Sequence, residues 1–131
     1  TSVELSDTCS TDAKYFAYED VEGGISITGY SIEGGVDVVI PSNINGKQVV
    51  SIGNTAFCFN KLTSVTIPSS VTSIGYKAFF KNDSSNLNLT KIINKTGKSF
   101  DWGYIVNNSS GYNFVTGTVV NSNGNVEVVS E

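Results

Sequence analysis

Residues that could carry out covalent chemistry are few in this chain of 131 residues. The sequence contains no histidine, so it can form no Ser-His or Cys-His nucleophile pair and no imidazole metal site. It has no glycine-rich phosphate-binding motif. Glu19, Asp20 and Glu22 form a carboxylate cluster that lacks the spacing of a calcium-binding loop, and we interpret it as a solvated acidic turn. We predict that the chain is not an enzyme and binds no cofactor or metal, although the sequence leaves open a carboxylate pair for glycoside hydrolysis.

The amino-acid composition indicates which class of protein this chain belongs to. Hydrophobic residues make up 39% of the chain and charged residues 15%, which predicts one domain with a substantial core and a surface of small polar side chains. No apolar run approaches the ~20 residues of a membrane helix, so we expect no membrane span in this fragment. We interpret Thr1 as a processed or truncated start.

The sequence contains a repeated segment, and any binding surface of the chain must be built on it. Segment 51–57 recurs at 73–79, while segments 38–41 and 62–63 recur at 65–68 and 89–90. The offset between 51–57 and 73–79 is shorter than the other two. The loop at 44–48 lengthens the first coil, and the insertion at 83–87 precedes the last copy. A repeat of this length is typical of a solenoid, in which each coil buries its apolar face against its neighbours.

Each coil should contain two short strands and one helical turn. Apolar runs and alternation predict strands at 15–18, 25–30, 36–40, 49–52, 62–67, 71–74 and 89–93. Helical turns are expected at 54–60 and 76–82. The residues expected to point inward are Val65, Ile67, Val71, Ile74, Ala78 and Phe79, with Phe57 above Phe79 and Ile52 above Ile74.

Two outward columns of side chains follow from this alignment. One contains Asp37, Ser64 and Lys91, and the next contains Val39, Thr66 and Ile93. Adjacent strands lie ~4.8 Å apart, so each column would form a continuous stripe. The stripe could be a packing ladder or a candidate binding face, and the sequence leaves both open.

The motif Ile67-Pro-Ser-Ser-Val-Thr-Ser-Ile-Gly-Tyr-Lys-Ala-Phe79, with Leu62 and Val65 before it, resembles the BspA-type leucine-rich repeat of bacterial surface proteins. The resemblance covers about residues 15–96, with two full and two partial repeats. Asn60 and Asn82 stand where that family often has cysteine. The expected fold is mainly β with short helical turns: a short leucine-rich repeat solenoid with a β-rich C-terminal cap.

The resemblance implies a non-catalytic, extracellular or cell-surface binding module that acts in adhesion or host and matrix interaction. Its partner would be a protein or glycan on a host cell or matrix. The alternative is the soluble head of a type IV pilin-like (minor pilin) subunit that contacts neighbouring copies in a surface fibre after removal of an apolar N-terminal helix.

The charges divide along the chain. Residues 1–40 hold eight acidic groups and one lysine, while residues 47–98 hold seven lysines and one acidic group. The division could simply solvate the surface, or it could support head-to-tail contact between copies. Nucleic acid is not an expected partner, since the lysines are dispersed and the chain has no arginine.

Cys9 and Cys58 are the two cysteines. In a surface protein of the kind that the resemblance implies, they suggest a disulfide, and the alternative is two free thiols.

The chain divides into a leader at 1–14, the repeat region at 15–93 and the cap at 94–131. Asn123-Gly124 predicts a hairpin turn in the cap. Trp102, Tyr104, Tyr112 and Phe114 are expected to close the core.

Overall fold

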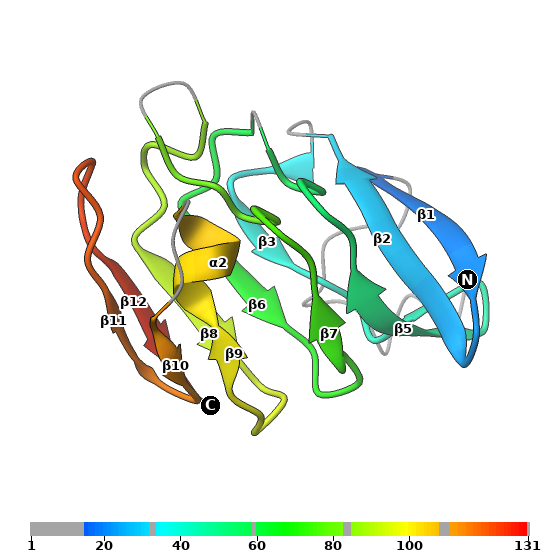
Figure 1. The fold of residues 1–131 in the computed structure, drawn as a ribbon. Helices are drawn as coiled ribbons and strands as arrows, with labels where there is room; N and C mark the ends of the chain where they lie inside the picture. The colour runs from blue at the N-terminus through cyan, green and yellow to red at the C-terminus, as the bar shows by residue number, and fades with distance from the viewer. Residues whose placement is uncertain (1–14, 32–33, 59, 83–84, 108–110, 131) are drawn as a thin grey trace.

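The computed structural model describes residues 15–31, 34–58, 60–82, 85–107 and 111–130, so the predicted leader lies outside the described residues. Figure 1 shows the described elements. In chain order they are β1 (Phe16–Val21), β2 (Gly24–Tyr30), β3 (Asp37–Val39), β4 (Asn43–Ile44), β5 (Lys47–Ile52), β6 (Ser64–Ile67), β7 (Ser73–Ile74), β8 (Lys91–Asn94), β9 (Phe100–Asp101), α2 (Trp102–Val106), β10 (Asn113–Phe114), β11 (Gly117–Val119) and β12 (Val126–Val129).

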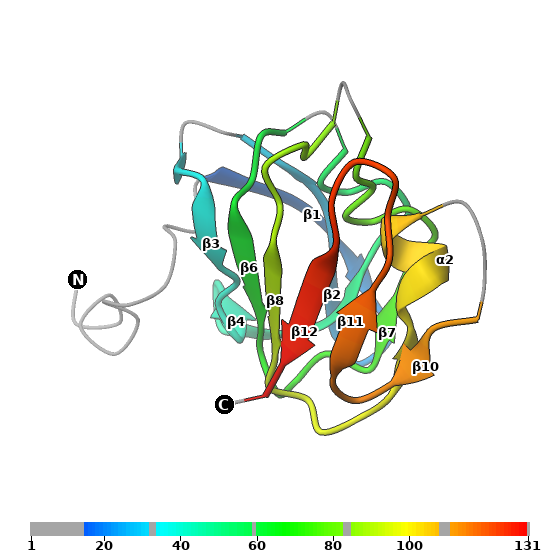
Figure 2. The same cartoon turned by 90° about the vertical axis from the view of Figure 1, so that its left-hand side faces the viewer.

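One face of the molecule is a sheet with the strand order β11-β12-β8-β6-β3, which faces the viewer in Figure 2. Strands β3, β6 and β8 run parallel, and Val38 pairs with Val65, which pairs with Ile92. Each step along the sheet crosses one coil of the repeat. The register predicted from the repeat is therefore confirmed on this face.

The second sheet lies behind the first in Figure 2 and contains the other strand of each coil. Strands β2, β5 and β7 run parallel, with Ile27 beside Ile52 and Ile52 beside Ile74. The predicted pairing of Ile52 with Ile74 is confirmed. β1 pairs antiparallel with β2, and β4 pairs antiparallel with β5.

A column of turns closes the third side of the coils. The amide of Phe57 donates to the carbonyl oxygen of Ala78 at 2.9 Å, and the amide of Phe79 donates to that of Ile105 at 3.2 Å. Helix α2 thus continues the column, although the sequence motif predicts that the repeat ends near Asn94. Backbone hydrogen bonds hold this column and do not require the repeat's side chains, so the stacking continues where the motif is lost.

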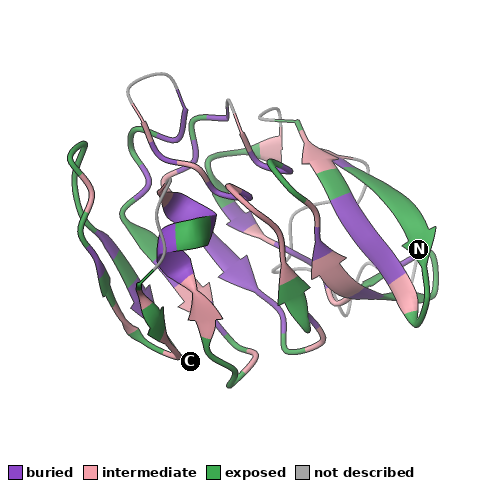
Figure 3. Cartoon of the chain, viewed as in Figure 1, coloured by how far each residue is buried: buried purple, intermediate pink, exposed green. Residues whose placement is uncertain are grey.

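The core lies between the two sheets and the turns, as the purple segments of Figure 3 show. Five of the six residues expected to point inward are fully buried: Val65, Ile67, Val71, Ala78 and Phe79. The sixth, Ile74, is half-buried. The rings of Phe57 and Phe79 lie with their centroids 4.9 Å apart, which confirms their predicted stacking.

Two hairpins differ from the expectation. Glu19 and Asp20 lie within β1, not in an acidic turn, because antiparallel pairing with β2 extends to Val21. The longer loop of the first coil contains the β4–β5 hairpin, whose turn residues Asn45 and Gly46 have φ values of 54° and 78°. Asn-Gly is a strong hairpin signal, so the sequence does contain the information that specifies this turn.

The C-terminal segment adds to both the sheet and the core. β12 pairs parallel with β8 and antiparallel with β11, which places a hairpin around Asn123-Gly124 as predicted. Trp102 is fully buried, while Tyr112 and Phe114 are half-buried against the core. Tyr104 does not close the core: it is 45% exposed and packs against Tyr76, with the ring centroids 4.8 Å apart and the ring planes tilted by 48°.

Thr55 and Lys77 occupy equivalent positions in successive turns, and both have a φ of 54°. A left-handed conformation costs an L-residue about 1–2 kcal/mol, and glycine avoids that cost while losing about 0.5–1 kcal/mol of conformational entropy. We therefore expect Thr55→Gly to raise the free energy of unfolding by about 0.5–1 kcal/mol, measured by urea denaturation. Thr90→Gly is the matched control, because Thr90 is exposed and has no positive φ. It should lower stability, and the same sign for both variants would contradict the strain at Thr55.

Candidate binding surface

The first predicted column forms a row across three strands. Asp37 pairs with Ser64, and Ser64 pairs with Lys91. Ser64 Oγ donates to Asp37 Oδ1 at 3.0 Å. Asp37 and Lys91 are exposed and Ser64 is half-buried. The structure therefore brings these three residues together with a negative charge at one end and a positive charge at the other.

Two further residues extend this row, and sequence reasoning missed both. Glu127 of β12 pairs with Lys91, and Thr118 of β11 pairs with Glu127. Both are exposed. The alternation of Val126, Glu127 and Val128 indicated a strand with an outward glutamate, but it did not indicate which strand that glutamate would join. We call the row Asp37, Ser64, Lys91, Glu127 and Thr118 the polar row.

The second predicted column lies beside the polar row. Val39 pairs with Thr66, Thr66 pairs with Ile93, and Ile93 pairs with Val129. Val39, Ile93 and Val129 are half-buried, while Thr66 is only 7% exposed and presents little surface. This column therefore gives the face a mostly apolar margin.

Two ionisable side chains of the described residues bond to the protein's own backbone. Across the described ranges, no three histidine, cysteine or carboxylate side chains converge as metal ligands would. Burial raises the pKa of Tyr30 to about 12, and its hydroxyl donates to the Gly35 carbonyl oxygen at 2.8 Å. Burial also lowers the pKa of Lys81, whose Nζ donates to the Leu87 and Leu89 carbonyl oxygens at 2.9 and 2.5 Å. Both side chains hold the protein's own backbone and lie outside the polar row.

A lysine from the basic part of the chain and an aspartate from the acidic part form an ion pair within one molecule. Lys47 Nζ lies 2.7 Å from Asp20 Oδ1, with both side chains largely exposed. The hydrogen bond to Asp20 raises the pKa of Lys47. This acidic and basic pair therefore needs no neighbouring copy.

Only one cysteine of the predicted disulfide is described, because Cys9 lies outside the described residues. Cys58 is half-buried, with Sγ 3.9 Å from the Lys77 carbonyl oxygen. The Cys9–Cys58 bridge therefore stays a prediction. In the described part of the chain, no helix has the length and hydrophobicity to cross a bilayer.

Comparison with known proteins identifies the repeat. A family model described as a BspA type leucine rich repeat region (6 copies) matches residues 37–105, just over half of the chain. The range inferred from the sequence, 15–96, starts earlier and stops earlier. The match reaches into α2, in agreement with the turn column. None of the curated proteins matches the chain.

Two solved structures of bacterial leucine-rich repeat proteins are similar. A crystal structure of a leucine-rich repeat protein from T. pallidum is 36% identical, with a TM-score of 0.50, and covers 64% of this chain and 42% of that chain. The chain thus spans about two fifths of the T. pallidum protein. A leucine-rich repeat protein from Bacteroides capillosus is 29% identical, with a TM-score of 0.49, and covers 67% of this chain and 73% of that chain. The repeat motif, the parallel coils and the matched family model agree, and the chain belongs to the BspA-type leucine-rich repeat family.

Proposed function

We propose that this chain is a non-catalytic binding module of a bacterial cell-surface or secreted protein, and that it attaches to a protein or glycan on a host cell or matrix. The observation that carries the proposal is the polar row, which crosses all five strands of one sheet. Repeat proteins commonly bind partners along such regular surfaces. Membership of the BspA-type family supports a role in protein interaction rather than catalysis.

The polar row suits a partner with charges of both signs. Asp37 and Lys91 are exposed on the same face, with Glu127 beside Lys91. Charges arranged in this way contribute mainly to specificity and the rate of association. The half-buried side chains of the neighbouring column add apolar contact area. A protein surface with complementary charges therefore fits this face.

We expect the triple variant Asp37→Ala, Ser64→Ala and Lys91→Ala to weaken attachment about tenfold or more, which corresponds to a loss of about 1.4 kcal/mol of binding free energy. Its free energy of unfolding should change by less than about 1 kcal/mol, since surface substitutions are usually mild. Attachment is measured on surfaces coated with host matrix proteins or host-cell glycans.

The control is a triple variant of the same chemistry outside the polar row: Glu19→Ala, Ser73→Ala and Lys61→Ala, which alters three exposed positions. It should attach as well as the unmodified chain. Equal attachment by both triple variants would show that the polar row does not bind the partner.

A second candidate, a subunit of a pilin-like surface fibre, is favoured by one observation. β11 is at the end of its sheet and, among the described strands, pairs only with β12. An open edge of this kind can accept a strand from another copy. Concentration-dependent assembly, measured by light scattering beside the attachment assay, would support this candidate over the first.

A further inference from the structure

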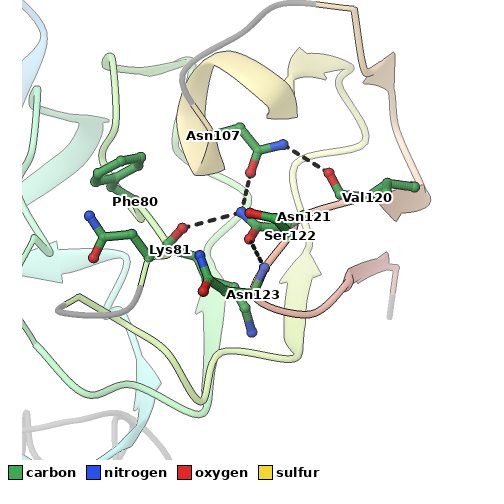
Figure 4. A pocket seen from close by; sticks show the side chains of 8 residues that line it. Phe80, Lys81, Asn107, Val120, Asn121, Ser122 and Asn123 are labelled. Atoms are coloured by element: carbon green, nitrogen blue, oxygen red, sulfur yellow. Dashed lines mark hydrogen bonds between the residues drawn. The ribbon is translucent and has the colours of Figure 1, made fainter.

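A recess lies away from the polar row, where three segments meet. It is bounded by the end of the second turn, the C-terminal end of α2 and the tip of the β11–β12 hairpin (Figure 4). Its volume is about 320 Å³, at the lower end of the range for small-molecule sites. The lining residues that matter for its chemistry are Phe80, Asn107, Val120, Asn121, Ser122 and Asn123.

Hydrogen bonds to the protein itself hold the wall of this recess in place. Asn121 Nδ2 donates to the Lys81 carbonyl oxygen at 3.2 Å and to Asn107 Oδ1. Asn107 Nδ2 donates to the Val120 carbonyl oxygen at 3.0 Å. Asn121 Oδ1 accepts from the amide of Asn123 at 2.7 Å. The positions of Asn107, Asn121 and the Asn123 backbone are therefore set before any ligand arrives.

The rim keeps hydrogen-bonding groups available. Ser122 and Asn123 are exposed, and neither the Ser122 hydroxyl nor the Asn123 side-chain amide makes a hydrogen bond to another described residue. An amide offers two donors and an acceptor, and a hydroxyl offers one donor and an acceptor. This combination matches the adjacent donor and acceptor groups of a ligand rich in hydroxyls.

The recess presents no free charge from the described residues that line it. Its one ionisable member, Lys81, is only 3% exposed, and its ammonium donates to the Leu87 and Leu89 carbonyl oxygens. Apolar contact comes from Phe80, which is half-buried, whereas the Val120 side chain points away from Phe80 in Figure 4. The residues that line the recess present no free charge, although Lys77 Nζ lies 4.5 Å from the centroid of the Phe80 ring. An aromatic ring with amide and hydroxyl groups beside it suits an uncharged ligand ring with one apolar face.

We propose that this recess binds a neutral saccharide, with one sugar ring against Phe80 and its hydroxyls on Asn123 and Ser122. The site is separate from the polar row and goes beyond the proposed attachment function. A protein partner on the polar row and a sugar at the hairpin tip could be held by the same molecule.

The test is a nuclear magnetic resonance titration of the isotope-labelled chain with glucose, galactose and N-acetylglucosamine. We expect saturable shifts of the Asn107, Asn121 and Asn123 signals for at least one sugar. Asn123→Ala should weaken that binding about fivefold to tenfold, as expected for the loss of one hydrogen bond. Phe80→Ala, which removes the aromatic ring of the lining, should weaken it as well.

Asn88→Ala is the matched control, since Asn88 is exposed and outside the recess. It should leave sugar affinity unchanged, and so should the triple variant of the polar row. Absence of saturable shifts with all three sugars, or equal affinity for Asn123→Ala and Asn88→Ala, would overturn this proposal. Neither result would affect the polar row, which is tested by its own variant.

Discussion

Replacing Phe79 with alanine should lower the free energy of unfolding by about 3–5 kcal/mol, as truncation of a buried phenylalanine does. Phe79 is fully buried, and its ring packs against that of Phe57 in the middle of the coils. Phe57 in turn contacts Phe16 and Tyr30, with centroid separations of 6.2 and 5.4 Å. Loss of the Phe79 ring would therefore open a cavity at one end of an aromatic column that links several coils.

Phe80→Ala provides the comparison, because Phe80 is the next residue on the same turn and is half-buried. Its ring lies 4.5 Å from Lys77 Nζ and lines the surface recess. The cost of Phe80→Ala should be clearly smaller than that of Phe79→Ala in the same urea titration. If Phe79→Ala unfolded at the same urea concentration as the unmodified chain, the assignment of Phe79 to the core and the register of the coils would both be wrong.

The spacing of the repeat predicted most of the parallel register. The longer offset aligned Val38 with Val65, the shorter offset aligned Ile52 with Ile74, and both pairs are neighbours in the structure. Such prediction works because each coil contacts only the next one, so sequence spacing converts directly into spatial pairing. The candidate surface followed from the same alignment, which placed Asp37, Ser64 and Lys91 in one row.

Prediction failed where pairing no longer followed the repeat. Glu127 joins the polar row because β12 pairs with the free side of β8, and no sequence offset relates these two strands. Tyr104 shows a different limit: aromatic character suggested burial, yet its position on α2 packs it outward against Tyr76. The recess at the hairpin tip combines residues 80–82, 107 and 120–123, which only the folded chain brings together.

Asn86 belongs to the insertion that interrupts the repeat, yet it is fully buried. Its Nδ2 donates to the carbonyl oxygens of Phe57 at 2.8 Å and Phe80 at 3.1 Å. Its Oδ1 accepts from the amide of Leu62 at 3.2 Å. One side chain thus satisfies three backbone groups, including two carbonyls from successive turns. Asparagine also tolerates the left-handed conformation that Asn86 adopts, with a φ of 51°.

Replacing Asn86 with leucine should therefore lower the free energy of unfolding by about 4 kcal/mol or more, because two penalties add. Each buried backbone group left unpaired costs about 1–3 kcal/mol, and leucine at a left-handed position adds about 1–2 kcal/mol. The change keeps a side chain of similar size, so the loss reports on hydrogen bonding and backbone conformation rather than on an empty cavity. Urea denaturation of the purified variant provides the measurement.

Asn45→Leu separates the two contributions to the effect at Asn86. Asn45 has nearly the same φ, 54°, but it is exposed, and among the described residues its side-chain amide donates to the exposed Tyr18 hydroxyl. Its substitution should therefore cost about 1–2 kcal/mol, the left-handed conformation alone. A loss at Asn86 no greater than that at Asn45 would show that the three buried hydrogen bonds contribute nothing measurable. The expected excess would instead identify Asn86 as the side chain that joins the two turns to the segment that leads into β6.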